Sequence, residues 1–117
     1  MSDALIEHLR DLFAPLGPIS ARAMFGGYGL YFDGVIIGVI MDEALYLKTD
    51  AETRNRFEAA GCAPFVHDMK GRPLPMSYWS LPEDAMDSPQ AMRPWALLAI
   101  EAARRKPAKK PRKRRSS

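Results

Sequence analysis

The chain has 117 residues, of which 47% are hydrophobic, so it has room for one domain with a single modest core. Its longest apolar runs are far shorter than the roughly 18 to 20 residues that span a bilayer, and the N-terminus lacks the basic and apolar blocks of a secretory signal. A single cysteine, Cys62, excludes an internal disulfide and agrees with a reducing compartment. We therefore expect a cytoplasmic protein without a membrane segment.

The net charge of +3 hides a strong asymmetry along the chain. Residues 1–103 carry eight basic and fourteen acidic side chains, a balance of −6, whereas residues 104–117 carry nine basic side chains and no acid. A block of like charge with few apolar residues does not offset its own ordering entropy. We expect a folded domain over residues 1–105 and a disordered basic tail over residues 106–117.

The first predicted element is an amphipathic helix at the N-terminus. Apolar residues recur at spacings of three and four between Leu5 and Leu16, which places them on one face of a helix. Ser2 or Asp3 can cap its start. The prolines and glycine of residues 15–18 end it, and the chain should become extended near Ile19.

A meander of strands should follow. Tyr28–Phe32, Val35–Met41 and Ala44–Lys48 have the aromatic and β-branched residues that suit strands. Asp33-Gly34 predicts a type I′ hairpin turn, because both central residues of that turn need positive φ. Val35–Met41 is apolar on both faces, so we expect a central strand covered on each side or by a partner chain. Gly38 predicts a bulge or a close approach of backbone.

The second half predicts a helix, two strands and further helices. Thr49 or Asp50 should cap a helix over Ala51–Ala60, and Gly61 should end it in the left-handed conformation. Two short strands, Phe65–Asp68 and Met76–Ser80, should flank a loop over Met69–Pro75.

Two helix starts are predicted near the C-terminus. Ser80 to Glu83 resembles a capping box, and Ser88-Pro89 repeats the start signal. Pro94 interrupts the last helical pattern, so the helix should begin afresh near Arg93 or be kinked there. The element order predicts a two-layer α+β fold with an antiparallel sheet of five to six strands and helices on one side.

The segment Ser20–Gly34 contains four glycines and could be a ligand loop. A phosphate loop needs a Lys and then Ser or Thr after the last glycine, and Leu30-Tyr31 follows Gly29 instead. A dinucleotide loop opens a helix, and a KH loop joins two helices, whereas these glycines lead into a strand-like run. We interpret the glycines as turn residues.

No catalytic or metal site is predicted. His8, Cys62 and His67 lack paired metal-ligand spacing, so we expect no metal and no cofactor. His67 precedes Asp68 but no nucleophile motif accompanies the pair, and an exposed turn is the simpler interpretation. Cys62 should be a half-buried small hydrophobe. The two tryptophans, Trp79 and Trp95, should be core anchors.

Several short motifs, taken in order, resemble the TfoX N-terminal domain family. They are R-x-M-F-G-G-x-G at residues 22–29, YLK at 46–48, FEAAG at 57–61, MSY at 76–78 and WA at 95–96. The family-motif residues are Arg22, Met24, Phe25, Gly26, Gly27, Gly29, Tyr46, Lys48 and Tyr78. The resemblance covers about Leu5 to Arg105.

The resemblance implies a fold similar to secretion chaperones, a homodimer, and a part in regulating DNA-uptake competence genes. It implies no catalytic residue and no cofactor, so we expect that the protein is not an enzyme. Long members of the family carry a second, helical domain, and here a basic tail stands in that place.

Two hypotheses for function follow. In the first, the body is a regulatory or protein-interaction module of unknown partner, and the tail holds it on nucleic acid by phosphate contacts. The residues predicted to bind are Arg104, Arg105, Lys106, Lys109, Lys110, Arg112, Lys113, Arg114 and Arg115. In the second, the protein is an enzyme or binds a small ligand in a pocket beside Phe25–Tyr28, with Arg22 and Lys48 contacting an anion. The first hypothesis is preferred, although the tail could instead be solubilising or fold back on the acidic body.

Overall fold

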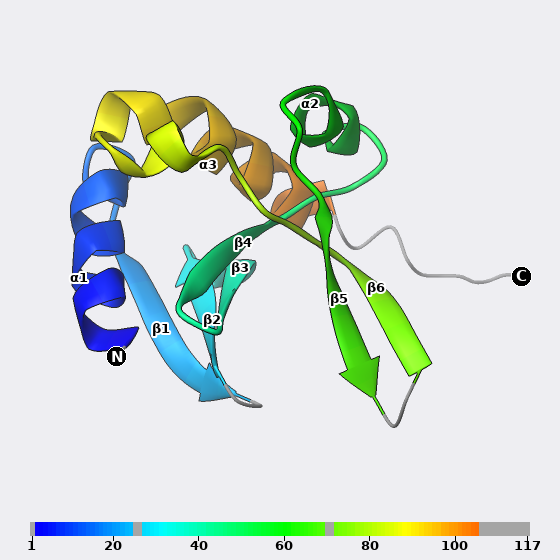
Figure 1. The fold of residues 1–117 in the computed structure, drawn as a ribbon. Coiled ribbons are helices and arrows are strands. Elements are labelled where there is room, and N and C mark those ends of the chain that lie inside the picture. Colours follow the sequence, from blue (N-terminus) through cyan, green and yellow to red (C-terminus); the bar gives the residue numbers. More distant parts are fainter. Residues whose placement is uncertain (1, 25–26, 70–71, 106–117) are drawn as a thin grey trace, which may run out of the picture.

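The structure is a computed structural model that describes residues 2–24, 27–69 and 72–105, with the backbone alone for residues 2, 24, 66–69 and 72–76 (Figure 1). The predicted tail, residues 106–117, lies outside the described residues. The elements are α1 (Ser2–Phe13), β1 (Ile19–Met24), β2 (Gly27–Phe32), β3 (Val35–Met41), β4 (Ala44–Lys48), α2 (Arg54–Ala59), β5 (Pro64–Met69), β6 (Arg72–Trp79), the 3₁₀ helix η1 (Glu83–Met86) and α3 (Pro89–Arg105).

The strands form one antiparallel sheet in the order β1-β2-β3-β4-β6-β5. Helix α3 contacts β3 and β4, and α1 packs against α3 and β1, so the helices form a second layer. Only two residue pairs join β4 to β6, and the hairpin of β5 and β6 extends away from the other strands (Figure 1). The predicted two-layer α+β fold with a sheet of five to six strands is confirmed.

The core lies between the two layers. Leu9 and Phe13 of α1 are fully buried, as are Leu30 and Leu47 of the sheet. Burying one large apolar side chain stabilises the fold by about 1.5 to 3 kcal/mol. This packing explains why the apolar stripe near the N-terminus forms a helix although twelve isolated residues are marginal for one.

The tryptophans and the cysteine contribute to this core. Trp79 is buried, and the ring of Trp95 lies edge-on against buried Phe57, with centroids 5.0 Å apart. Cys62 is half-buried and packs against the core cluster. The sequence-based predictions of tryptophans in the core and of a half-buried cysteine are confirmed.

The hairpin turn between β2 and β3 has the predicted conformation. Asp33 and Gly34 have φ values of 52° and 84°, as a type I′ turn requires. The next turn repeats this geometry with φ of 51° at Asp42 and 64° at Glu43. Left-handed backbone is unfavourable for a residue with a Cβ, so the second turn is held by strand pairing rather than by its sequence.

Strand β3 lies between β2 and β4 in the sheet, and Gly38 allows β4 to approach it closely. The pairing with β2 shifts register beside Gly38, and a Cβ at this residue would lie 2.7 Å from the carbonyl oxygen of Tyr46. The predicted bulge and close approach are both confirmed. Helix α3 packs on one side of β3. Val39 points to the other side and is only 5% exposed, so that side of the strand is covered as well.

The second helix is shorter than predicted, its N-cap is Thr53 without a side-chain cap hydrogen bond, and Asp50 closes the turn before it instead of capping it. Helix α2 begins at Arg54, after a turn in which the Asp50 carboxylate accepts hydrogen bonds from the backbone N–H groups of Glu52 and Thr53. The Thr53 hydroxyl accepts one from the Asp50 N–H in return. Gly61 follows the helix with a φ of 85°, the left-handed conformation predicted for it.

Two predictions about the region after α2 are wrong. The loop expected over Met69–Pro75 is mostly strand, because β5 and β6 pair from Met69 and Arg72 outward. The Ser80 hydroxyl accepts a hydrogen bond from the Ala63 N–H instead of capping a helix, and η1 has no side-chain cap.

The last helix starts at the predicted Ser88-Pro89 signal. The Ser88 hydroxyl accepts a hydrogen bond from the Ala91 N–H, and α3 then runs without a break to Arg105. The predicted restart near Arg93 is wrong. Pro94 sits inside the helix, where packing of the buried alanine face on β3 and β4 outweighs the missing hydrogen bond.

Candidate functional site

The glycine-rich segment does not form a ligand loop in the part that the structure describes. A Cβ on Gly27 would overlap the carbonyl oxygen of Ile40 on the neighbouring strand, so this glycine is required for close strand approach. Tyr28 packs against the core. Phe25 and Gly26 lie outside the described residues, so the pocket predicted beside Phe25–Tyr28 stays a prediction.

One face of the sheet points away from α1 and α3, and strand register identifies the residues on it. Arg22, Gly29, Val39 and Tyr46 are successive Cα partners across β1, β2, β3 and β4. Directly paired residues of antiparallel strands point to the same side of a sheet. Their neighbours along the strands belong to the core, so this row faces outward.

Two cations on this face lie over tyrosine rings. The guanidinium carbon of Arg22 is 5.5 Å from the ring centroid of Tyr31, and the Lys48 Nζ is 5.2 Å from that of Tyr78. Both distances are within the range of a cation–π interaction. Lys48 also donates a hydrogen bond of 3.1 Å to the Ser77 hydroxyl. Each cation is therefore held close to the sheet surface.

Several aromatic side chains lie on the same side of the sheet. The rings of Tyr46 and Phe65 have centroids 4.9 Å apart and planes tilted by 56°. Burial raises the pKa of Tyr78, and the nearby phenol of Tyr31 raises that pKa further. Tyr31 and Tyr78 come from β2 and β6, so they approach each other across β3 and β4. We call this surface the outer aromatic face and define it by Arg22, Tyr31, Tyr46, Lys48, Phe65 and Tyr78.

Most of the predicted family-motif residues meet on this side of the sheet. By register, it holds all six motif positions whose side chains the structure describes, namely Arg22, Gly27, Gly29, Tyr46, Lys48 and Tyr78. Met24 is the last residue of β1. Sequence reasoning did not include Tyr31 and Phe65. The alternation of Tyr31 with Gly29 is the one local signal that could have identified Tyr31.

Arg104 and Arg105, two of the residues predicted to bind nucleic acid, pair with acids of the body. Arg104 lies 3.2 Å from Asp33 at the first hairpin turn. Arg105 forms a bidentate pair with Asp50, with contacts of 2.7 and 3.1 Å. The other seven predicted residues lie outside the described part of the chain.

The pair between Asp50 and Arg105 shifts both ionisation equilibria. The hydrogen bonds from Arg105, with those from the backbone of Thr53 and Glu52, lower the pKa of Asp50 from 3.8 to about 2 against the opposing effect of burial. The same contact raises the pKa of Arg105. Bidentate geometry ties the last residue of α3 to the turn before α2.

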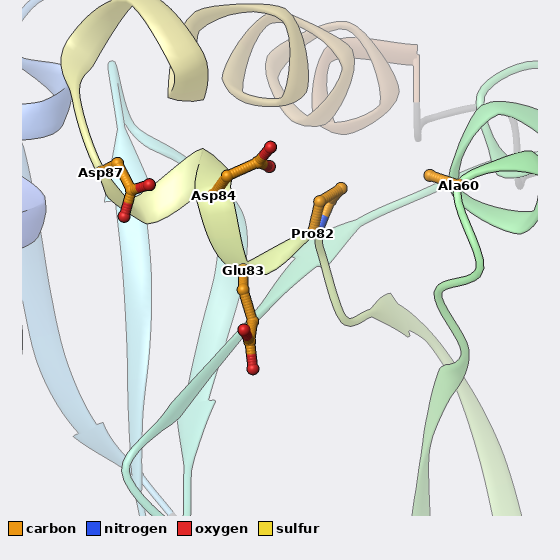
Figure 2. A pocket seen from close by; sticks show the side chains of 5 residues that line it. All are labelled: Ala60, Pro82, Glu83, Asp84 and Asp87. Atoms are coloured by element: carbon orange, nitrogen blue, oxygen red, sulfur yellow. The ribbon is translucent and has the colours of Figure 1, made fainter.

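An acidic hollow of about 560 Å³ lies between the end of α2 and η1. Ala60, Pro82, Glu83, Asp84 and Asp87 line it, and Figure 2 shows the three carboxylates pointing in different directions. Divergent carboxylates do not supply the convergent oxygen ligands that a hard cation needs. Across the residues that the structure describes, no group of three His, Cys, Asp or Glu side chains could hold a metal ion.

His8 and Cys62, the other candidate residues with described side chains, have structural and not chemical roles. The His8 Nε2 lies 2.7 Å from the Met86 carbonyl oxygen, which links α1 to η1. Burial raises the pKa of the Cys62 thiol, which disfavours the reactive thiolate. The backbone of His67 lies in strand β5 and not in the turn predicted for it, and its side chain lies outside the described residues. Within the described ranges, none of the helices has the length and apolar character needed to cross a bilayer.

Comparison with known proteins agrees with these motifs. The profile of the TfoX N-terminal domain matches residues 11–103. The chain is also similar to the DNA transformation protein TfoX1 of Aliivibrio fischeri (strain ATCC 700601 / ES114), with 29% identity over 103 residues, which is 85% of this chain and 49% of the relative. The chain thus spans about half the length of this curated relative. Because the family profile covers nearly the whole described body, the chain belongs to the TfoX N-terminal domain family.

Proposed function

We propose that the protein is a non-catalytic regulatory module of the competence-related type, held on duplex DNA by its basic C-terminal segment. Family membership and the name of the relative, a DNA transformation protein, support the regulatory part. The relative is about twice as long, so its whole activity is not transferred to this chain. The body would contact a protein partner, and the segment would supply affinity for DNA without reading its sequence.

The observation that carries the DNA tether is the segregation of charge. Residues 106–117 contain seven basic residues and no acid, whereas residues 1–103 have a balance of −6. Arg104 and Arg105 already pair with Asp33 and Asp50, so they contribute less to phosphate binding than the residues beyond them. Seven cations within twelve residues can release condensed counterions from a polyanion, which is the main source of non-specific DNA affinity.

Neutralising the tail while keeping the full chain tests this proposal. We replace Lys106, Lys109, Lys110, Arg112, Lys113, Arg114 and Arg115 by Gln and measure affinity for a random duplex at low salt by fluorescence anisotropy. Binding to the duplex should be lost. The variant leaves α3 and its ion pair with Asp50 untouched, so a loss of binding reports on charge alone.

A charge-preserving variant is the matched control. Exchanging each of these Lys residues for Arg and each Arg for Lys keeps seven cations and should keep duplex affinity, because phosphate contacts depend on charge more than on residue type. The tether is refuted if the Gln variant binds the duplex as tightly as the wild type. The predicted homodimer is a separate proposal, which sedimentation of the wild type tests.

A further inference from the structure

We propose that Arg104 exchanges partners on DNA binding: it pairs with Asp33 in the free protein and contacts a phosphate once the basic segment, residues 106–117, binds a duplex. Arg105 stays with Asp50 in both states. The proposal rests on the proposed function, because the basic segment must first bring the duplex to the end of α3. It gives different roles to two neighbouring arginines that the sequence alone groups together.

The ion pair between Arg104 and Asp33 is exposed and easily replaced. Its contact measures 3.2 Å between the Arg104 Nη2 and the carboxylate, and the two side chains are 55% and 72% exposed. Such a pair contributes little to stability, because water screens it and both side chains lose freedom in forming it. Another anion can therefore take Arg104 from Asp33 at little cost.

The ion pair between Arg105 and Asp50 differs in geometry and in surroundings. Two guanidinium nitrogens donate to the carboxylate at 2.7 and 3.1 Å, and the Asp50 side chain is 26% exposed. Glu52 and Glu101 lie 3.7 and 3.8 Å from the same guanidinium. Three carboxylates thus surround one arginine. A phosphate that approached Arg105 would meet like charge, so this arginine keeps its partner.

Arg104 lies close to the start of the basic segment. Lys106, the first cation of that segment, is two residues further along the chain, which corresponds to at most about 7 Å of extended backbone. Duplex DNA carries a phosphate charge for every ~1.7 Å of its axis. A duplex bound at Lys106 therefore has phosphates within reach of the Arg104 side chain, whose planar guanidinium suits them.

The same charges indicate the side from which the duplex approaches the body. Asp33 lies at the turn between β2 and β3, whereas Asp50 and Glu52 precede α2. The carboxylates around Arg105 repel phosphates from the α2 side. The duplex should therefore lie beside the turn between β2 and β3, and Asp33 should oppose its binding for as long as it holds Arg104.

A double-mutant cycle on the full chain tests this exchange. We measure the anisotropy of a labelled random duplex at low salt for wild type, Asp33→Asn, Arg104→Gln and the double variant. Asp33→Asn should raise duplex affinity about two- to fivefold, because it frees Arg104. Arg104→Gln should lower the affinity by a similar factor. In the double variant the gain from Asp33→Asn should disappear, because no arginine remains to be freed.

Asp42→Asn is the matched control. Asp42, like Asp33, is an exposed residue with positive φ at a turn between neighbouring strands, and asparagine tolerates that backbone. Its effect on duplex affinity should be smaller than that of Asp33→Asn and the same with or without Arg104. Arg105→Gln should leave duplex affinity near that of the wild type but lower the free energy of unfolding, because it breaks the pair with Asp50.

The outcomes separate this proposal from the tether. An equal gain from Asp33→Asn with and without Arg104 would show a general effect of charge and overturn the exchange. Wild-type duplex affinity in Arg104→Gln, or a larger loss in Arg105→Gln, would also overturn it, even where the tail Gln variant loses binding. If the tail Gln variant binds as tightly as the wild type, the tether is wrong and the exchange falls with it. Arg104 is exposed, so its variant should fold, and thermal unfolding of each variant checks this.

Discussion

The Asp50 side chain joins the turn before α2 to the end of α3. Its carboxylate accepts hydrogen bonds from two backbone N–H groups of the turn before α2 and from two nitrogens of Arg105. These contacts lower its pKa to about 2. One side chain therefore closes the turn before α2 and ties the end of α3 to that turn.

Replacing Asp50 by Asn should reduce the free energy of unfolding by about 1 to 2 kcal/mol at neutral pH, a value discounted for partial solvent exposure. The native pKa of Asp50 lies below the ordinary 3.8, so its stabilisation is present above pH 3.8 and is lost as pH falls toward about 2. The difference between wild type and variant should therefore narrow in acid. Urea unfolding at pH 7 and at progressively lower pH measures it.

Asp84→Asn is the matched control for this pH series, because it removes an exposed carboxylate from η1. Its stability should follow the wild type at each pH. A variant Asp50→Asn that unfolds at the same urea concentration as the wild type at pH 7 would show that the ion pair does not stabilise the fold.

At the scale of elements, two glycines of the meander have different tasks. Gly34 has a φ of 84° and open space where a Cβ would be, so its role is conformational. Gly38 lies in β3, where a Cβ would be 2.7 Å from the carbonyl oxygen of Tyr46. A side chain at Gly38 would push β3 and β4 apart.

Gly34→Ala should therefore reduce stability by about 1 kcal/mol, the usual cost of left-handed backbone for a residue with a Cβ. Gly38→Ala should cost more, because strand pairing and the packing of Leu47 are disturbed together. Thermal unfolding of both variants tests the order. A lower melting temperature for Gly34→Ala than for Gly38→Ala would contradict this order.

A third prediction concerns Pro94, which lies inside α3. The ring removes a hydrogen bond to the carbonyl of Gln90, and the residue is exposed. Pro94→Ala should raise stability by roughly 1 kcal/mol, which is less than the full helix propensity difference because the unfolded chain also gains freedom. Arg93→Ala, an exposed change one residue earlier, is the control and should be nearly neutral. A less stable Pro94→Ala would show that the proline shapes the packing of α3.

At the scale of the whole molecule, charge and aromatic surface are separated. The basic segment follows α3, whereas the outer aromatic face lies on the side of the sheet that the helices leave uncovered. The salt dependence of duplex binding should therefore come from the basic segment.

For the duplex, the logarithm of affinity should fall with the logarithm of salt concentration with a slope no steeper than about −7, set by seven tail cations and by Arg104. Anisotropy titrations over a salt series give this slope. A tail Gln variant that kept the affinity and the slope of the wild type on the duplex would contradict this origin of the salt dependence.

Short sequence patterns predict most helices, strands and turns, but not the residues at which they begin and end. The turn at Asp33-Gly34, the cap at Ser88 and the left-handed Gly61 were predictable because each depends on a few neighbouring residues. The boundaries of β5 and β6 and the continuity of α3 through Pro94 were not, because they depend on pairing and packing with distant segments.

The sequence by itself determined the family, the α+β class and the segregation of charge, since these depend on residue order and composition alone. The tertiary structure alone decided the outer aromatic face. Tyr31, Tyr46 and Tyr78 come together because β6 pairs with β4 and places β5 at the edge of the sheet. That strand order arises from long-range backbone pairing and core burial, which no local pattern along the chain encodes.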